Sequence, residues 1–120
     1  MGNINYDEMK QKYLESDVVL LASIRENCAT TMLEALSYGK PVISLKMTGM
    51  ALLNNESCGR FIEGNTNFEF RNSLANNIIY FIKNKDKLDK FAAGCILTAQ
   101  KYTWTKNIKY YNNIYKMILK

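Results

Sequence analysis

The sequence predicts the α/β class: a partial parallel sheet of about three strands, followed by helices toward the C-terminus. Short apolar runs at residues 17–22, 42–45 and 58–62 have the length of strands. The first two runs are apolar enough to be covered on both faces of a sheet. Segments with helical spacing separate the runs, and strands that alternate with helices in this way form parallel sheets.

The elements of the first half follow in a regular order. Residues 6–14 have the apolar spacing of a helix and precede the first strand. The next helix, from about residue 28 to 38, has a buried side that includes Met32 and Leu36. Gly39 is expected to end this helix in a left-handed conformation, and the proline two residues later prevents its continuation.

The second half is predicted to be mostly helical. A short helix at residues 50–55 leads to the third strand. Three longer amphipathic helices then complete the chain, at residues 70–83, 87–100 and 103–117.

Length and charge indicate one globular domain with a basic C-terminal part. The chain has 120 residues and a formal charge of +5, and its lysines are concentrated after residue 82. A solvated helical surface explains this charge, and binding to nucleic acid or to an anionic membrane stays open as an alternative. No apolar run approaches the roughly 20 residues that span a bilayer, and no signal peptide is recognisable, so a cytoplasmic location is expected.

The cysteine and histidine content restricts the chemistry. Cys28, Cys58 and Cys95 are odd in number and widely spaced, and the sequence has no histidine. Neither a disulfide framework nor a zinc site is expected, and the thiols should be reduced. Without histidine, the chain has no Ser–His or Cys–His nucleophile.

The segment from residue 25 to 41 is the candidate site. It joins the first two predicted strands, and parallel sheets bind ligands beyond the carboxyl ends of their strands. A helix that begins near Cys28 or Ala29 would offer free backbone N–H groups to a phosphate. The loops at residues 23–30 and 47–49 are expected to form the rim of one crevice.

Two carboxylates flank this helix start. Glu26 and Glu34 are eight residues apart, or roughly 10 Å along a helix axis. Carboxylates accept hydrogen bonds from diols, so the pair suits a nucleotide-sugar, whose pyrophosphate lies between a ribose and a sugar. In the alternative interpretation, Glu34 only forms a capping box with Thr31, and Glu26 is an acid near a helix N-terminus.

The same stretch resembles a known family. Residues 13–23, Glu26 and residues 32–43 resemble the C-terminal half of the group 1 (family-four) retaining glycosyltransferases, which have the two-domain GT-B architecture with Rossmann-like sheets. Glu26 and Glu34 match the E-x(7)-E motif of that family, and residues 33–43 match its L-E-A-x-x-x-G-x-P-V-I run. Thr48-Gly49 half matches a later G-G turn.

The resemblance implies a role for each candidate residue. Glu26 would contact the donor sugar and stabilise an oxocarbenium-like transition state, and Glu34 would hold the ribose hydroxyls. The remaining nucleotide-sugar-binding residues would be Asn27, Cys28, Ala29, Thr30 and Gly49. Neither a metal nor another cofactor is expected, because the helix N-terminus and basic residues neutralise the leaving phosphate in such folds.

The chain also departs from the family pattern. Asn27 and Ala29 replace the two glycines of the family's E-G-F-G. The family's basic pair and its acceptor-binding domain correspond to sequence upstream of residue 1, which leaves Lys46 as a weak basic candidate. Residues 1–120 are therefore expected to be a truncated C-terminal donor-binding domain that lacks the N-terminal acceptor domain and is inactive alone.

When completed by that domain, it is expected to transfer a sugar from a nucleotide-sugar to a saccharide or lipid-linked glycan, as in polysaccharide biosynthesis. The alternative is a non-catalytic Rossmann-like domain that is inert or forms a homo-oligomer through an exposed apolar edge. Nucleic acid is not an expected partner, and peripheral contact with the inner face of a membrane stays open.

Overall fold

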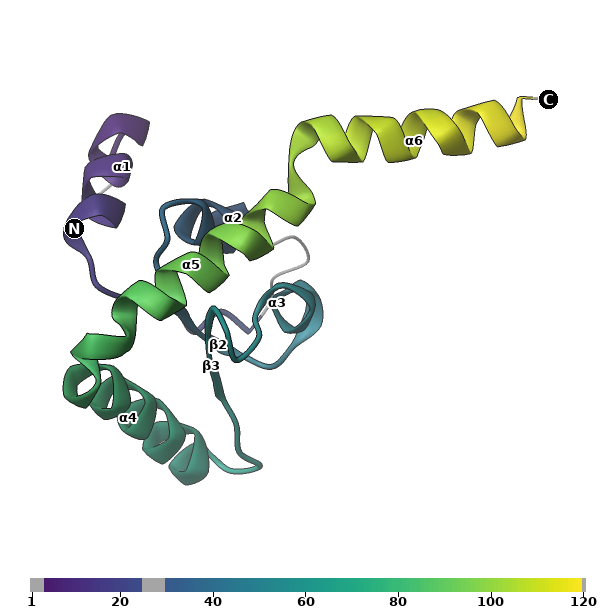
Figure 1. The fold of residues 1–120 in the computed structure, drawn as a ribbon. Helices are drawn as coiled ribbons and strands as arrows, with labels where there is room; N and C mark the ends of the chain where they lie inside the picture. Colours follow the sequence, from purple (N-terminus) through teal and green to yellow (C-terminus); the bar gives the residue numbers. More distant parts are fainter. Residues whose placement is uncertain (1–3, 25–29, 120) are drawn as a thin grey trace.

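The computed structural model describes residues 4–24 and 30–119 and contains a three-stranded parallel sheet (Figure 1). Its strands are β1 (Val19–Leu21), β2 (Val42–Leu45) and β3 (Gly59–Ile62), arranged in the order β1-β2-β3. Val42 is paired with Val19 on one side and with Gly59 on the other. The predicted α/β class is confirmed, and β1 is shorter than its apolar run.

All the predicted helices are present. They are α1 (Tyr6–Glu15), α2 (Thr30–Ser37), α3 (Thr48–Leu53), α4 (Asn67–Lys83), α5 (Leu88–Ala99) and α6 (Trp104–Ile118), with 3-10 turns η1 (Lys85–Lys87) and η2 (Gln100–Tyr102) beside α5. The helix α4 begins earlier than its apolar pattern indicates, because Thr66 and Glu69 form a capping box there.

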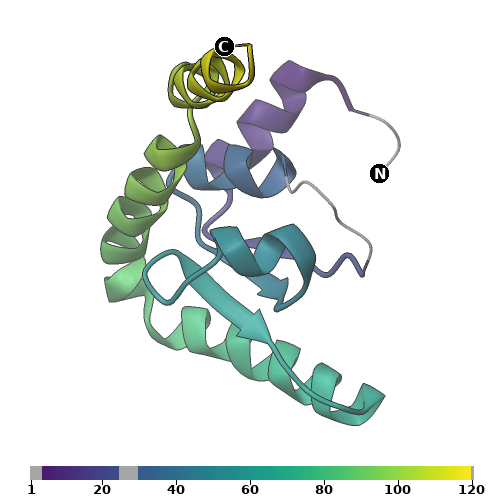
Figure 2. The same ribbon diagram turned by 90° about the vertical axis from the view of Figure 1, so that its right-hand side faces the viewer.

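The sheet lies between α4 on one side and α2 and α3 on the other (Figure 2). The helix α5 packs against α2, and α4 contacts β2 and β3. Every residue of β2 is buried, as expected for the central strand of a sheet that helices cover on both faces. The largest fully buried side chains come from α2, β2 and α3: Met32, Leu36, Val42, Ile43 and Met50.

The end of α2 is fixed by its glycine. Gly39 has a φ of 68°, the left-handed conformation that the sequence predicted. Its N–H donates to the carbonyl of Leu36, and the N–H of Lys40 donates to that of Ala35, which is the hydrogen-bond pattern of a Schellman motif. The chain therefore turns directly from α2 into the central strand.

Buried asparagines join the loops and helices to the sheet. The Nδ2 of Asn54 lies 2.9 Å from Ser44 Oγ, 3.2 Å from the carbonyl of Arg60 and 3.3 Å from that of Val42. Asn77 of α4 donates to the carbonyl of Phe61 at 2.7 Å. These amides satisfy polar groups of β2 and β3 that the packed helices exclude from water.

The first strand differs from the expectation that helices cover both of its faces. Leu20 is 49% exposed, so β1 is not covered on both of its faces. Beside it is an apolar hollow of about 310 Å³, which Ile78 and Ile82 of α4 also line. The ion pair between Asp17 and Lys85, 3.7 Å apart, lies next to this hollow.

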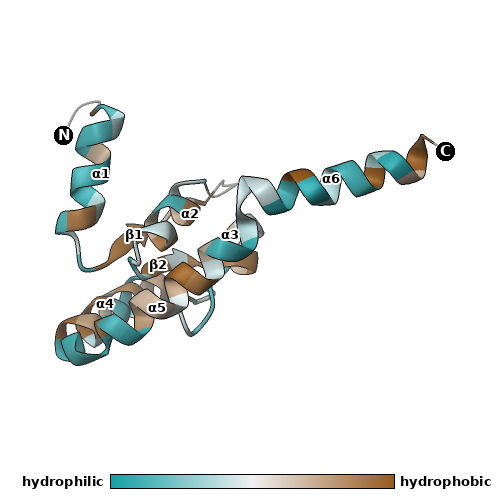
Figure 3. Ribbon diagram, turned by 45° about the horizontal axis from the view of Figure 1, so that its top comes forward, coloured by the Kyte–Doolittle hydropathy of each residue, from teal (hydrophilic) through white to brown (hydrophobic). Residues whose placement is uncertain are grey.

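The last helix extends away from the rest of the molecule (Figure 1). The main contact of α6 is with the adjacent turn η2. Apolar residues recur along α6 (Figure 3), and most of them are exposed. Trp104, for example, is 82% exposed and Ile118 is 72% exposed. Among the helices that the structure describes, none has the length and apolar character needed to cross a membrane.

Candidate functional site

A hollow of about 380 Å³ lies at the carboxyl edge of the sheet. Ala22 and Ile24 reach it from the end of β1, Met47 from the end of β2 and Ile62 from β3, and α4 covers its other side. The described parts of the two predicted rim loops therefore meet at one hollow. Its lining is mostly apolar, which suits the body of an organic ligand better than a phosphate.

Four of the predicted site residues lie outside the described part of the chain: Glu26, Asn27, Cys28 and Ala29. Thr30 is described and is the exposed first residue of α2. Gly49 is half-buried in the first turn of α3, and α2 contacts α3. Two predicted donor-binding residues thus lie at the described start of α2 and in the first turn of the neighbouring α3.

Glu34 is half-buried in the second turn of α2. Its Oε2 accepts a hydrogen bond from the hydroxyl of Tyr13, over 3.2 Å. Thr31 lies inside α2, so it cannot act as the N-cap of a capping box with Glu34, and the capping interpretation is wrong. Glu34 is not among the residues that line the hollow at the carboxyl edge.

Tyr13 of α1 is itself held firmly. Its side chain is 5% exposed, and its ring stacks on that of Tyr38 with the centroids 5.3 Å apart and the planes 17° apart. Burial raises the pKa of Tyr13 to about 12, and the negative charge of Glu34 adds to the increase. The hydroxyl group is therefore protonated, and able to donate, throughout the neutral range.

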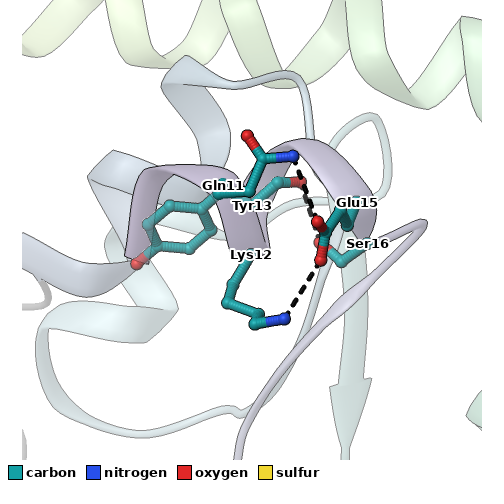
Figure 4. A network of polar contacts seen from close by, with 5 residues as sticks. All are labelled: Gln11, Lys12, Tyr13, Glu15 and Ser16. Carbon is teal, nitrogen blue, oxygen red and sulfur yellow. Dashed lines mark hydrogen bonds and ion pairs between the residues drawn. The ribbon is translucent and has the colours of Figure 1, made fainter. Parts of the chain in front are cut away.

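The end of α1 that carries Tyr13 is stabilised by local polar contacts (Figure 4). Gln11 and Lys12 each donate to the carboxylate of Glu15 at 3.1 Å, and these bonds lower the pKa of Glu15. The hydroxyl of Ser16 donates to the carbonyl of Tyr13 at 3.0 Å. These contacts lie in the last turn of α1, which ends at Glu15, two residues after Tyr13.

The basic candidate Lys46 already has a partner. It follows β2 and forms an ion pair with Glu63, with 3.1 Å between Nζ and Oε1, and both side chains are 60% exposed. Such exposed pairs are weak and exchange readily with other partners. Among residues 4–24 and 30–119, no group of three or more histidine, cysteine, aspartate or glutamate residues is placed to hold a metal ion.

Comparison with known proteins agrees with the sheet and with the residue pattern. Residues 1–115 match the family model for glycosyl transferases group 1. The chain belongs to this glycosyl transferase family. No curated protein sequence matches the chain significantly.

A solved structure shows the same fold. The chain is similar to sucrose-phosphate synthase from Thermosynechococcus elongatus, with a TM-score of 0.84 and 19% sequence identity. The match covers 99% of this chain and 29% of the synthase chain. The partial Rossmann-like sheet with its C-terminal helices is therefore the fold of part of a GT-B glycosyltransferase.

The hydrogen bond from Tyr13 to Glu34 was not predicted from the sequence. Tyr13 falls in a predicted helix and in the segment that resembles the family, and it lies 21 positions before Glu34. Neither helical nor strand periodicity relates two positions so far apart. The burial of Asn54 and Asn77 was missed for a different reason, because an isolated asparagine in a sequence resembles a surface residue.

Proposed function

We propose that the chain is the donor-binding domain of a retaining glycosyltransferase and binds a nucleotide-sugar. The observation that carries the proposal is the placement of Glu34, a half-buried carboxylate whose Oε2 is held by a tyrosine from another helix. Glu34 occupies the second acidic position of the E-x(7)-E motif in a chain that belongs to the group 1 family.

Glu34 would bind the ribose of the donor. A carboxylate can accept hydrogen bonds at both of its oxygens, and a ribose offers two adjacent hydroxyl donors. Within the described residues, the carboxylate of Glu34 accepts its hydrogen bond at Oε2. The other oxygen, Oε1, can therefore receive the diol.

The diphosphate would lie at the start of α2. Thr30 belongs to its first turn, where the helix dipole and the backbone N–H groups favour an anion. Gly49 lies in the first turn of the neighbouring α3, and its missing side chain would allow the ligand a close approach. Asn27, Cys28 and Ala29 complete the proposed phosphate-binding segment.

Glu26 would act on the donor sugar. In a retaining transfer, the sugar ring that loses its leaving group develops positive charge in an oxocarbenium-like transition state. A negative charge near that ring stabilises this state. The leaving diphosphate would be stabilised by the helix N-terminus, without a resident metal. The sugar would then pass to an acceptor that we propose is a saccharide or a lipid-linked glycan, on the cytoplasmic side of the membrane.

The acceptor would be bound by a second domain. The chain spans 29% of the length of the sucrose-phosphate synthase chain that it matches, and α6 exposes its apolar residues. The helix contains Lys106, Lys109 and Lys116 but no acidic residue, so its charge favours a partner surface that carries carboxylates. We propose that the acceptor-binding domain covers α6 with an apolar surface that carries carboxylates.

Calorimetric titration with UDP-, GDP- and ADP-sugars tests the donor proposal. We expect one of them to bind, and Glu34→Gln to weaken binding roughly tenfold or more through the lost charged hydrogen bonds. Glu56→Gln is the matched control, because the exposed Glu56 precedes β3 and so lies toward the opposite edge of the sheet. Absence of binding at millimolar donor, or equal effects of the two substitutions, would refute the proposal.

A further inference from the structure

We propose that Tyr13 is a positioning residue for donor binding: its hydroxyl holds one oxygen of Glu34 so that the other faces the ribose. This inference rests on the proposed function of Glu34. It adds a residue from α1, outside the E-x(7)-E segment, to the donor site.

The hydrogen-bond geometry assigns the direction of the contact. The hydroxyl of Tyr13 lies 3.2 Å from Oε2 of Glu34 and 3.4 Å from the carbonyl of Thr31. The hydroxyl has one proton, and a bond to an ionised carboxylate is stronger than one to a neutral carbonyl. Donation to Glu34 is therefore favoured, with the carbonyl as a weaker second acceptor.

The tyrosine can position Glu34 because it cannot move easily itself. Its ring is buried and stacks on Tyr38, which follows α2 directly. A second link joins the same elements, since Nζ of Lys40 donates to the carbonyl of Leu14 at 3.3 Å. The carboxyl end of α1 is thus attached both to the centre of α2, through Glu34, and to the segment just after α2, through Lys40.

A fixed carboxylate binds a diol better than a mobile one. A glutamate side chain has several rotatable bonds, and ordering it on binding costs conformational entropy. The bond from Tyr13 orders Glu34 before the ligand arrives, and this preorganisation raises affinity without a new contact to the ligand.

A purely structural role makes different predictions. If the bond only joined α1 to α2, its loss would lower stability and would weaken all ligands equally. If it positions Glu34, its loss will weaken only ligands that carry ribose hydroxyls. Tyr13→Phe separates these roles, because it keeps the buried ring and the stack on Tyr38 and removes only the hydroxyl.

The experiment is a calorimetric comparison on the whole chain. The probe is whichever of UDP, GDP and ADP binds tightest, together with its 2′,3′-dideoxy counterpart. We expect Tyr13→Phe to weaken the ribose form about tenfold, the scale of a charge-assisted hydrogen bond, and to leave the dideoxy form unchanged. In the Glu34→Gln background, Tyr13→Phe should have no further effect, because both changes remove one interaction.

Tyr6→Phe is the control, since Tyr6 is an exposed tyrosine of the same helix and should leave both affinities unchanged. If Glu34→Gln weakens ribose binding and Tyr13→Phe does not, the positioning role is wrong and the donor proposal stands. Equal weakening of both probes by Tyr13→Phe also overturns the positioning role. If the native chain binds neither probe, or binds both equally well, the donor proposal itself fails.

Discussion

Removal of the Asn54 amide should destabilise the protein more than the same substitution at an exposed asparagine. Asn54 is 4% exposed, and its Nδ2 lies within 3.3 Å of three acceptors on β2 and β3: Val42 O, Ser44 Oγ and Arg60 O. An NH₂ group has two protons, so two of these bonds are strong at a time.

The expected magnitude follows from those two bonds. Each buried acceptor left without a partner costs about 1–3 kcal/mol, so Asn54→Ala should lower the free energy of unfolding by about 2–6 kcal/mol. Since the total free energy of unfolding of such domains is about 5–15 kcal/mol, a loss of this size is measurable. Asn54→Asp should cost more at neutral pH, because an ionised carboxylate would face the same acceptors without a proton to donate.

Urea denaturation followed by far-ultraviolet circular dichroism measures the effect. Tryptophan fluorescence is unsuitable, because Trp104 is the only tryptophan and is 82% exposed on α6. Asn76→Ala on the exposed side of α4 is the matched control and should change stability by less than about 0.5 kcal/mol. Equal stability of the Asn54→Ala and Asn76→Ala variants would refute the view that this amide joins β2 to β3.

Two further stability predictions concern the ends of α2 and α1. Gly39→Ala should cost about 1–2 kcal/mol in a urea titration, since φ is 68° there and the new methyl group would meet Cβ of Ala92 at 3.3 Å; an unchanged midpoint would contradict it. Burial raises the pKa of Tyr13 to about 12, so the folded state holds this proton more tightly than the unfolded state. The stability that this tighter proton binding contributes is complete below pH 10 and is lost as the pH rises toward 12. Over that range the free energy of unfolding of the native protein should therefore fall more steeply than that of Tyr13→Phe. Parallel curves for the two proteins would exclude this contribution.

The sheet and the helices could be predicted from sequence because their signals are local. The run at residues 42–45 became β2 without a change of boundary, and Gly39 ended α2 as its residue type required. The parallel arrangement followed from the alternation of apolar runs with helical segments. Boundaries moved where side-chain caps decide them, as at the start of α4.

Contacts between distant elements could not be predicted in this way. The bond from Tyr13 to Glu34 joins two helices whose separate patterns contain no information on their relative placement. The apolar spacing of α6 predicted a helix correctly, but the same spacing is typical of a buried helix and of one that meets another domain. Exposure of Leu20 was missed because an apolar run does not reveal which strand lies at an edge.

The E-x(7)-E spacing gave the candidate site only in outline. Its second acid, Glu34, is described and accepts a hydrogen bond from Tyr13. The roles of all the candidate residues stay predictions: Glu26, Asn27, Cys28, Ala29, Thr30, Glu34 and Gly49. A homo-oligomer and contact with a membrane stay open as alternatives, and the saccharide or lipid-linked acceptor stays a prediction.

A crystal structure of the chain with a bound nucleoside diphosphate would show directly whether Glu34 binds the ribose. We expect both ribose hydroxyls within hydrogen-bond distance of the Glu34 carboxylate, with Tyr13 on its other oxygen and the diphosphate at the start of α2. A nucleotide bound elsewhere, with Glu34 touching only Tyr13, would contradict the assignment of Glu34 as the ribose-binding residue.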